Sequence, residues 1–427
     1  MKTVLIFSCA LMVVLLNACT HQVNMGGDAY SKQTAQQIRI DPKKMNQALD
    51  GFVKNGQLIG ASAVIYQNDR EVYFGAFGAA NRETNQALSR DTLMRIYSMT
   101  KPVVGVALMQ LYEQGLFKLE DPIAKYIPEL SDLTLYAGSD RNGRMQVTMP
   151  IRQPTVLDFM RHTAGLGEEN SEGAVGELWR KLKPMDLQNS LTEVATKIGQ
   201  IPLRHEPGRV WRYGPSVEMQ ALMVERLSGQ PLNQYLHKNI FTPLAMKQTG
   251  YYIEPERRQR IAQLYKKEQD NIITVQPYHA TQVNLEHWAR SPGSYGLIST
   301  LDDYMRFARM LLNGGSLDGV KILTPQTIAL MATDYLGEAV SDRSWLDSKG
   351  RVGFGLDFAV RIEPPLGVEE VYGTVGEFFW DGYATTIFWV DPANQLAVVF
   401  FTQMIPYQEQ INKQLRDAVY GVSRSEQ

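Results

Sequence analysis

The amino-acid sequence predicts a fold of the α/β class, of the α+β type: an antiparallel sheet flanked by helices, with a mainly helical insertion. Two strand-like stretches occupy 60–67 and 71–78, a helical middle follows, and β character returns from residue 352. The late strands are joined by short turns and so pair antiparallel, and both ends of the chain most simply complete one sheet. The expected organisation is one domain over 39–427, made of a sheet part, 39–115 with 290–427, and an insertion, 116–289.

Cap and turn residues mark the first elements. Asp41 can cap a helix that runs to about Asn55, because apolar residues recur there at helical spacing. The polar turn "NDR" joins the expected strands "GASAVIYQ" and "EVYFGAFG". The next stretch, "RIYSMTKPVVGVALMQLYEQG" at 95–115, predicts a buried helix that ends near Gly115, where a glycine is expected to stop it.

Helical and β patterns follow one another through the rest of the chain. Helices are expected in the insertion at 155–162, 190–199, 216–228 and 231–239. A strong helix over 300–315 begins at the capping candidate Thr300 and ends at a pair of glycines. Four late stretches have β character: "VGFGLDFAVRI", "EVYGTVG", "TTIFWVD" and "LAVVFFTQM". A final helix is expected at 408–420.

The composition is that of an ordinary globular protein with a large core. The chain has 427 residues, of which 44% are hydrophobic and 21% charged, and its formal net charge is −2. Because there is no basic stripe, no nucleic-acid partner is expected. The six histidines include no H-E-x-x-H pattern and no pairing with cysteine, so no metal and no other cofactor are expected. The sequence does not indicate an oligomeric state.

The first residues are typical of an exported protein. An apolar run after Lys2 has the length of a signal peptide and is short for a membrane span. The following "LNAC" resembles the lipobox of bacterial lipoproteins, in which the cysteine, here Cys19, becomes lipidated. The other cysteine, Cys9, lies within the apolar run, so the exported chain has no internal disulfide partner for Cys19. The alternative is ordinary cleavage by a general signal peptidase.

These features predict a signal peptide over 1–18, a polar tether over 19–38, and attachment to a membrane through a lipid on Cys19. Thr20 follows the cysteine, which resembles outer-membrane sorting. The expected location is therefore the bacterial cell envelope, as an outer-membrane lipoprotein that faces the periplasm.

Ser98 and Lys101 are the first candidates for chemistry. A serine hydroxyl is a poor nucleophile until a base takes its proton. Lys101 follows by one helical turn, lies on the same face, and can act as that base if burial lowers its pKa. S-x-x-K alone is a weak pattern, and its plain alternative is a serine N-cap beside a solvated lysine.

A second proton-handling group and an oxyanion hole are also needed. Tyr213 in "WRYGPS" precedes the helix at 216–228 and can share a proton with a lysine; alternatively, it is an aromatic residue packed beside Trp211. The hole needs two N–H donors, of which Ser98 at its helix start supplies one. A strand edge near Gly382 can supply the other, unless that glycine only marks a β-bulge.

Together and in this order, the motifs resemble the serine β-lactamase and penicillin-binding-protein superfamily, with the nearer match to class C β-lactamases and family VIII carboxylesterases. "RIYSMTK" resembles their first motif and "WRYGPS" their tyrosine motif. "WDG" at 380–382 stands where β-lactamases have K-T-G and the esterases often have W-G-G. Stretches at 157–166, 228–251 and 294–315 also match, so the resemblance covers roughly 40–420.

The resemblance implies an acyl-enzyme mechanism without a cofactor. Ser98 would attack a carbonyl, and Lys101 with Tyr213 would receive the proton. The N–H groups of Ser98 and Tyr383 would hold the oxyanion. Tyr213 or Lys101 would protonate the leaving group, and water would then cleave the acyl-enzyme. An alcohol or amine in place of water would make the same site an acyltransferase.

The departures from the family pattern concern the substrate. β-Lactams and D-Ala-D-Ala peptides present a carboxylate, which the lysine of K-T-G usually meets; here Trp380 and Asp381 stand there, followed by Gly382. An aromatic ring and an anion should disfavour anionic substrates. Pro215 replaces the asparagine of the tyrosine motif and has no side-chain donor for a substrate amide. We therefore expect Trp380, Asp381 and Gly382 to contact a small neutral ester.

The expected function is hydrolysis of neutral carboxylic esters through an acyl-enzyme on Ser98. The nearest alternative is a β-lactamase or D-Ala-D-Ala carboxypeptidase with the same site, and another is a peptidase on D-amino-acid peptides. A non-catalytic envelope lipoprotein is disfavoured because Ser98, Lys101 and Tyr213 are all present. An α/β-hydrolase is not favoured, since no serine lies in G-x-S-x-G. A Ser-His-Asp triad could use His162 or His205, but His162 lies in "RHTAGL", which is more typical of a structural turn.

Overall fold

The computed structural model describes residues 38–269, 271–274 and 284–422. The expected signal peptide and Cys19 lie outside the described residues, as does the expected tether except Ile38, so these remain predictions. Within the described part of the chain, none of the helices is both long and apolar enough to cross a membrane.

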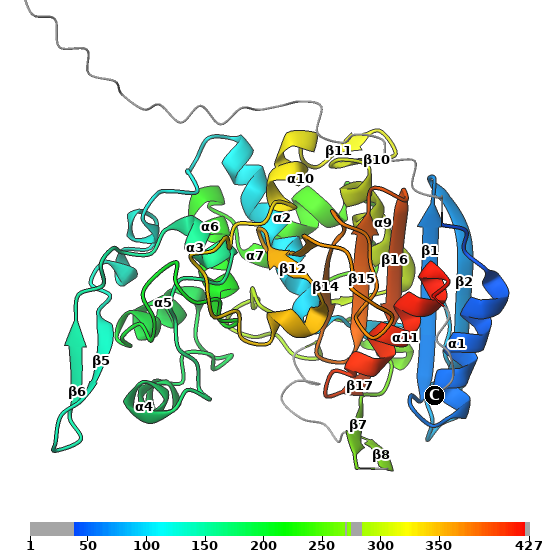
Figure 1. Ribbon diagram of the computed structural model, residues 1–427, viewed down its shortest axis with the longest axis horizontal. Coiled ribbons are helices and arrows are strands. Elements are labelled where there is room, and N and C mark those ends of the chain that lie inside the picture. Colours follow the sequence, from blue (N-terminus) through cyan, green and yellow to red (C-terminus); the bar gives the residue numbers. More distant parts are fainter. Residues whose placement is uncertain (1–37, 270, 275–283, 423–427) are drawn as a thin grey trace, which may run out of the picture. The chain divides into compact units, whose positions relative to one another are not determined.

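One antiparallel sheet organises the fold (Figure 1), with the strand order β12-β13-β14-β15-β16-β1-β2-β3. Its strands are β1 (Gly60–Gln67), β2 (Arg70–Asn81), β3 (Gln86–Ala87), β12 (Val352–Phe354), β13 (Ala359–Arg361), β14 (Phe378–Gly382), β15 (Thr386–Asp391) and β16 (Leu396–Phe401). β1 pairs with β16, with Ser62 opposite Phe401. The prediction that both ends of the chain complete one sheet is therefore confirmed.

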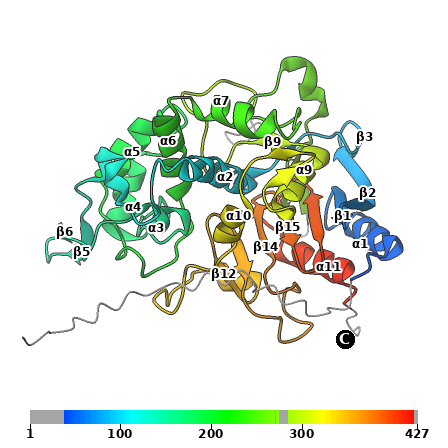
Figure 2. The same ribbon diagram turned by 90° about the horizontal axis from the view of Figure 1, so that it is seen from above.

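Helices cover both faces of the sheet (Figure 2). α9 (Leu301–Leu312) packs on β15, β16 and β1 from one face, while α1 (Pro42–Lys54) and α11 (Glu409–Tyr420) lie together on the other. Asp41 and Thr300 cap α1 and α9 by accepting a backbone N–H within the first turn, as the sequence predicts. The sheet is thus buried on both sides, which explains why its central strands read as continuous apolar runs.

The middle of the chain is mainly helical, as predicted, but it also contains small hairpins (Figure 1). Its helices are α3 (Val156–Met160), α4 (Gly173–Leu182), α5 (Leu191–Gly199), α6 (Ser216–Ser228) and α7 (Leu232–Leu236), which continues into a π-helical turn, η4 (His237–Phe241). Its hairpins are β5 (Leu135–Ser139) with β6 (Met145–Thr148), and β7 (Tyr265–Glu268) with β8 (Asn271–Thr274). The sequence did not predict α4 or the hairpins, whose short and largely polar strands give little alternation.

Short elements complete the described fold. The remaining strands are β4 (Met94–Arg95), β9 (Ile298–Ser299), β10 (Ser316–Leu317), β11 (Val320–Lys321) and β17 (Met404–Ile405). The remaining helices are α10 (Pro325–Met331) and the 3₁₀ turns η2 (Ile123–Lys125), η3 (Pro128–Leu130), η5 (Pro255–Arg260) and η6 (Leu346–Lys349). β4 pairs with β9 within the sheet part, whereas the pairing of β17 with β7 ties the insertion to the sheet part.

Three predicted elements differ in the structure. The S-x-x-K stretch is not one helix, because a 3₁₀ turn, η1 (Tyr97–Met99), precedes α2 (Thr100–Glu113). α2 ends as expected, with Gly115 in the left-handed conformation. "VGFGLDFAVRI" forms the hairpin β12–β13, which turns at the left-handed Asp357, rather than one strand. The β prediction at 370–376 is wrong: the segment is an irregular loop whose two glycines disfavour a strand.

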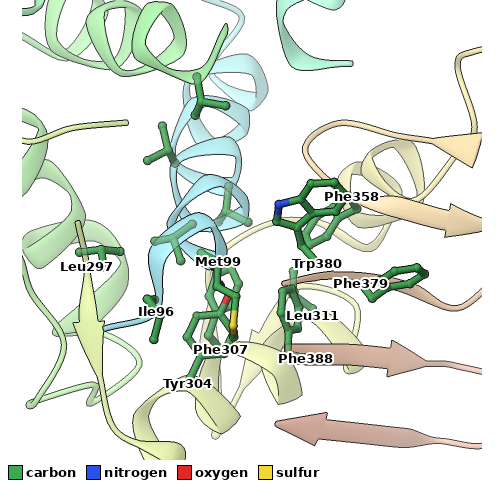
Figure 3. Close-up of a cluster of buried hydrophobic side chains, with 14 of the residues drawn as sticks. Ile96, Met99, Leu297, Tyr304, Phe307, Leu311, Phe358, Phe379, Trp380 and Phe388 are labelled. Carbon is green, nitrogen blue, oxygen red and sulfur yellow. Dashed lines mark hydrogen bonds between the residues drawn. The ribbon is translucent and has the colours of Figure 1, made fainter. Parts of the chain in front are cut away.

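The start of α2 is enclosed by the core (Figure 3). Met99 lies beside Tyr304 and Phe307 of α9, with Phe388 of β15 close by, and all four side chains are fully buried. The Tyr304 hydroxyl also donates to the Met99 carbonyl at 2.9 Å. Because a close-packed interior leaves little room for movement, the contacts with α9 and β15 hold the backbone that carries Ser98 in place.

A buried charged cluster ties α11 to the sheet. Glu377, just before β14, accepts from Arg361 Nε at 2.9 Å and from Arg416 Nη1 at 2.8 Å. None of these three side chains is exposed. Arg416 belongs to α11 and Arg361 to β13, so a single carboxylate joins the helix to two neighbouring strands.

Replacing this carboxylate should be costly. Glu377→Ala should lower the free energy of unfolding by about 3–5 kcal/mol, because two buried guanidinium groups lose their partner. Urea unfolding followed by circular dichroism measures the change. Glu369→Ala is the matched control, since Glu369 pairs with Lys413 of the same helix but is 82% exposed, and it should change stability little. Equal effects of the two substitutions would contradict the importance given to the buried cluster.

Candidate active site

Ser98 lies in a strained turn between β4 and α2. The preceding residue, Tyr97, has a φ of +46°, a left-handed conformation that is uncommon for a bulky side chain. The Thr100 hydroxyl accepts from the Leu297 N–H at 3.2 Å, which holds the turn against the segment before β9. The turn places Ser98 half-buried at the mouth of an otherwise buried helix. It is therefore presented to solvent on a rigid support.

Lys101 is buried one turn further along, at the bottom of the site. Its Nζ donates to Ser98 Oγ at 3.2 Å and to the Ser294 carbonyl at 2.7 Å. Burial lowers the pKa of Lys101 from 10.5 to about 7, although Glu218, Asp357 and Asp381 oppose this effect by their charge. A sizeable fraction of neutral amine is thus available at neutral pH to take a proton from Ser98.

Tyr213 lies over Lys101 and reaches Ser98. The Lys101 Nζ is 4.4 Å from the centre of the Tyr213 ring, and the tyrosine hydroxyl hydrogen-bonds with Ser98. The same hydroxyl accepts from Trp380 Nε1 at 3.2 Å. Burial raises the pKa of Tyr213, so the phenol keeps its proton at neutral pH. It is suited to donate a proton or a hydrogen bond, while Lys101 is suited to accept one.

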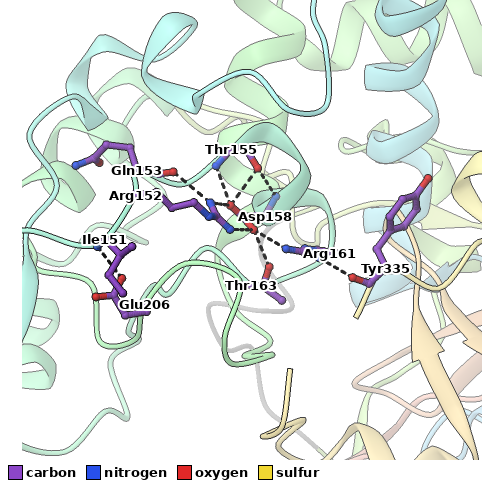
Figure 4. A network of polar contacts seen from close by, with 9 residues as sticks. All are labelled: Ile151, Arg152, Gln153, Thr155, Asp158, Arg161, Thr163, Glu206 and Tyr335. Carbon is purple, nitrogen blue, oxygen red and sulfur yellow. Dashed lines mark hydrogen bonds and ion pairs between the residues drawn. The ribbon is translucent and has the colours of Figure 1, made fainter. Parts of the chain in front are cut away.

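A polar network places the tyrosine segment (Figure 4). Asp158, at the start of α3, accepts from Arg152, from Arg161 and from the Thr163 hydroxyl at 3.1 Å. This fixes the turn that follows α3, where the His162 carbonyl accepts from the backbone N–H of Arg212 at 2.9 Å. Tyr213 is the next residue after that contact. A buried carboxylate in α3 therefore determines where the tyrosine backbone runs.

The end of β14 lies against the turn that carries Ser98. β13 pairs only with Phe378 and Phe379, so the last three residues of β14 have an open edge on that side. A Cβ at Gly382 would lie 2.4 Å from the Ile96 carbonyl oxygen, so only glycine allows this approach. The rings of Tyr97 and Tyr383 are in edge contact at 6.1 Å. The peptide N–H groups of Ser98 and Tyr383 thus belong to two abutting segments, as an oxyanion hole requires.

The neighbouring side chains of Trp380 and Asp381 contact different residues. Trp380 is buried and faces Tyr213, with ring centres 5.3 Å apart. Asp381 forms a buried ion pair with Lys349 of η6, and the Lys349 ammonium also lies 4.4 Å from the centre of the Tyr407 ring. The negative charge that the sequence predicted at Asp381 is therefore neutralised by Lys349.

A cleft of about 730 Å³ opens beside Tyr213, and the expected substrate contacts Trp380, Asp381 and Gly382 are not among the residues that line it. Its aromatic walls are formed by Tyr97, Trp179, Tyr213, Tyr295 and Tyr383. Tyr383 is 52% exposed at the rim, and Pro215 and Ser294 also line the cleft. Four charged residues, Glu168, Glu169, Lys183 and Asp186, complete the lining. Aromatic walls combined with polar groups are typical of small-molecule sites.

Among the described residues, no hydrogen bond joins His162 or His205 to a serine. His162 is buried against Tyr213, with ring centres 4.9 Å apart, and its ring nitrogens have no hydrogen-bond partner among the described residues. Burial lowers the pKas of His162 and of His205, which keeps both rings neutral at neutral pH. Within the described residues, no group of three or more His, Cys, Asp or Glu side chains is placed to hold a metal ion.

The fold and the grouping of Ser98, Lys101 and Tyr213 define a serine hydrolase of the kind that the motifs resemble. The chain belongs to the Beta-lactamase family, whose model matches residues 45–418. The predicted superfamily and fold class are therefore confirmed.

Three relatives illustrate the similarity. Protein Rv1367c of Mycobacterium tuberculosis (strain ATCC 25618 / H37Rv) is 30% identical over 82% of this chain and 87% of its own length. Esterase EstB of Burkholderia gladioli is 28% identical over 88% of this chain and 95% of its own. The solved structure of EstCE1, a hydrolase with promiscuous acyltransferase activity, has a TM-score of 0.73 and 23% identity, and covers 89% of this chain and 98% of that one. The last similarity concerns the fold.

Sequence reasoning missed several residues around the site. Lys349, Ser294 and Glu218 lie in elements far from the S-x-x-K motif, and no local pattern marks them. Lys349 lies in a polar stretch of sequence, and such a stretch predicts a solvated surface. Only the folded arrangement shows that its ammonium group is buried.

Gly382 offers a direct test of the close approach. Gly382→Ala should lower kcat for an ester substrate by about 10²–10³-fold, because the added methyl group must push the Tyr383 N–H away from Ser98. KM should change much less, since the cleft walls stay in place. Gly367→Ala is a suitable control, because its methyl group meets open space. A Gly382→Ala enzyme with unchanged kcat would contradict the role of this strand end.

Proposed function

We propose that the protein is a carboxylesterase that hydrolyses neutral esters through an acyl-enzyme on Ser98. The observation that carries the proposal is the 3.2 Å contact between the Ser98 hydroxyl and the buried Nζ of Lys101, whose pKa is near 7. A lysine of ordinary pKa would be protonated at neutral pH and unable to act as a base.

The proposed reaction has two halves. Ser98 Oγ forms a bond to the ester carbonyl carbon while its proton passes to Lys101 Nζ, and the N–H groups of Ser98 and Tyr383 hold the oxyanion. The C–O bond to the alcohol then breaks, and the alcohol takes a proton from Tyr213 or from the Lys101 ammonium. In the second half, water attacks the acyl carbon while Lys101 Nζ accepts its proton. The bond to Ser98 Oγ then breaks, Ser98 takes that proton back, and the acid leaves.

Charge in the site supports a neutral over an anionic substrate, because three carboxylates and a single lysine, Lys183, line the cleft. Trp380 occupies the position at which related β-lactamases have a lysine, and the nearby Lys349 is engaged by Asp381. Neither residue offers a free cation to a substrate carboxylate. Pro215, at the cleft wall, offers no side-chain donor to a substrate amide. The relative EstB, an esterase, agrees with this proposal.

Acyl transfer is a second candidate for the same site. The similar structure EstCE1 is described as a hydrolase with promiscuous acyltransferase activity. The cleft is open and large enough for an alcohol to stand where water would attack the acyl-enzyme. Product analysis in the presence of a short alcohol distinguishes the two outcomes.

The central test compares substrates on one purified enzyme. We expect kcat/KM for p-nitrophenyl butyrate to exceed that for nitrocefin, with the missing carboxylate contact contributing about ten- to a hundredfold. Intact-mass analysis should find one fluorophosphonate adduct, which Ser98→Ala and Lys101→Met abolish while the circular dichroism spectrum is unchanged. A preference for nitrocefin would favour a β-lactamase, and an unlabelled, inactive wild type would favour a non-catalytic protein.

The pH dependence follows from the direction of the Lys101 pKa shift. Only the neutral amine accepts a proton, so kcat/KM for p-nitrophenyl butyrate should fall about tenfold per pH unit below pH 7 and level off above it. Initial rates from pH 5.5 to 9, with circular dichroism at both ends, measure this limb. A flat profile on folded enzyme would exclude Lys101 as the base.

A further inference from the structure

Glu218 is a fully buried carboxylate behind the active-site lysine. It lies in α6, five residues after Tyr213, and faces the segment that precedes β9. Its Oε2 accepts from the Gly293 N–H at 3.1 Å, and its Oε1 accepts from the Ser294 N–H at 3.0 Å. The carboxylate therefore fixes the orientation of two successive peptide groups.

The same short segment holds the base. The Ser294 carbonyl accepts from Lys101 Nζ at 2.7 Å, the shorter of the two hydrogen bonds that the ammonium makes in this site. A residue whose N–H is held by Glu218 thus holds Lys101 by its carbonyl. A rotation of this segment would move Nζ relative to Ser98 Oγ.

A buried arginine connects Glu218 to the cleft. Arg290 Nε lies 3.5 Å from Glu218 Oε2, and only about 1% of the arginine side chain is exposed. Its guanidinium also donates to the carbonyls of Asn189, at 3.1 Å, and Met185, at 2.9 Å. Met185 lines the cleft, so one ion pair links the substrate wall with the support of the base.

We propose that Glu218 is a positioning residue for Lys101, which orients the Ser294 carbonyl against Nζ and supplies the main negative charge that acts on the ammonium. This inference rests on the proposed function, in which Lys101 is the general base. It assigns a role to a carboxylate that does not itself contact the reacting atoms.

The charged groups around Lys101 favour Glu218 for this role. Among the carboxyl groups that act on Lys101, Glu218 has the largest effect. Burial raises the pKa of Asp357, from the β12–β13 turn, well above the usual value, which disfavours its charged form. Asp381 of β14 forms a closer ion pair, with Lys349, than the 3.5 Å pair of Glu218 with Arg290, so its charge is more fully compensated. The remaining neighbour, His162, has its pKa lowered by burial and by Lys101, and it is neutral.

The key variant is Glu218→Gln, which keeps the shape and removes the charge. The acid limb of the kcat/KM profile should move to lower pH by about 0.5–1 unit, because the ammonium loses a favourable charge. The plateau kcat should fall about ten- to a hundredfold, since an amide cannot accept both N–H groups and Lys101 loses its fixed position. Asp357→Asn is the matched control and should leave the limb near its wild-type pH, since burial disfavours the charged form of this carboxyl group.

Glu218→Asp separates the two effects and serves if Glu218→Gln does not fold. The shorter side chain keeps the charge but cannot reach both peptide groups, so the limb should stay near the wild-type pH while kcat falls. The proposal would be overturned if a folded Glu218 variant kept both the wild-type kcat and the wild-type position of the acid limb of the kcat/KM profile. An equal limb shift in Asp357→Asn would also overturn it, because the charge effect would not belong to Glu218.

A measurement independent of turnover separates this inference from the proposed function. Lysine labelled with ¹³C at Cε allows the Lys101 amine to be titrated by NMR, with Lys101→Met identifying its signal. We expect the titration to move to lower pH in Glu218→Gln and to stay in Asp357→Asn. If the wild type hydrolyses no ester but this shift is seen, only the esterase proposal fails; if it hydrolyses esters without the shift, only the role of Glu218 fails.

Discussion

The active site depends on the burial of one ammonium group. Lys101 can serve a serine nucleophile only if its amine is neutral for part of the time, and removal from water is what makes the charged form costly. Full desolvation would also be harmful, since an amine with no partners has no fixed direction. The structure meets both needs by placing Nζ among aromatic rings while giving it Ser98 Oγ and the Ser294 carbonyl as partners.

The same principle separates the charges around the site. A buried charge is tolerated when it is paired, and each formal charge near Lys101 has its own partner. Asp381 is engaged by Lys349, and Glu218 by Arg290 and two peptide groups. The cleft is lined by aromatic side chains together with Glu168, Glu169, Lys183 and Asp186. The ion pairs behind its walls are thus compensated, and the charges that face the cleft are those of its own lining.

Local patterns were enough to predict much of the fold. Asp41 and Thr300 marked helix starts, and the apolar runs of β1, β15 and β16 marked strands of one sheet, because caps and continuous burial leave a signal within a few residues. The π-helical turn after α7 and the hairpin at Asp357 have no such signal. The open edge at Gly382 could be suggested, but its contact with Ile96 depends on packing between segments far apart in the chain. Lys349 and Glu218 were missed for the same reason.

The pairing of β1 with β16 has a consequence for the order in which the molecule forms. The Ser62 hydroxyl donates to the Phe401 carbonyl across 339 residues of chain, and closing a loop of that length costs about 5 kcal/mol of chain entropy beyond a constant. β1 and β2 are synthesised long before β16. The edge of β1 that pairs with β16 therefore stays unpaired until Phe401 has been made. The sheet can be completed only once β16 has left the ribosome, and an unpaired strand edge exposed until then favours aggregation.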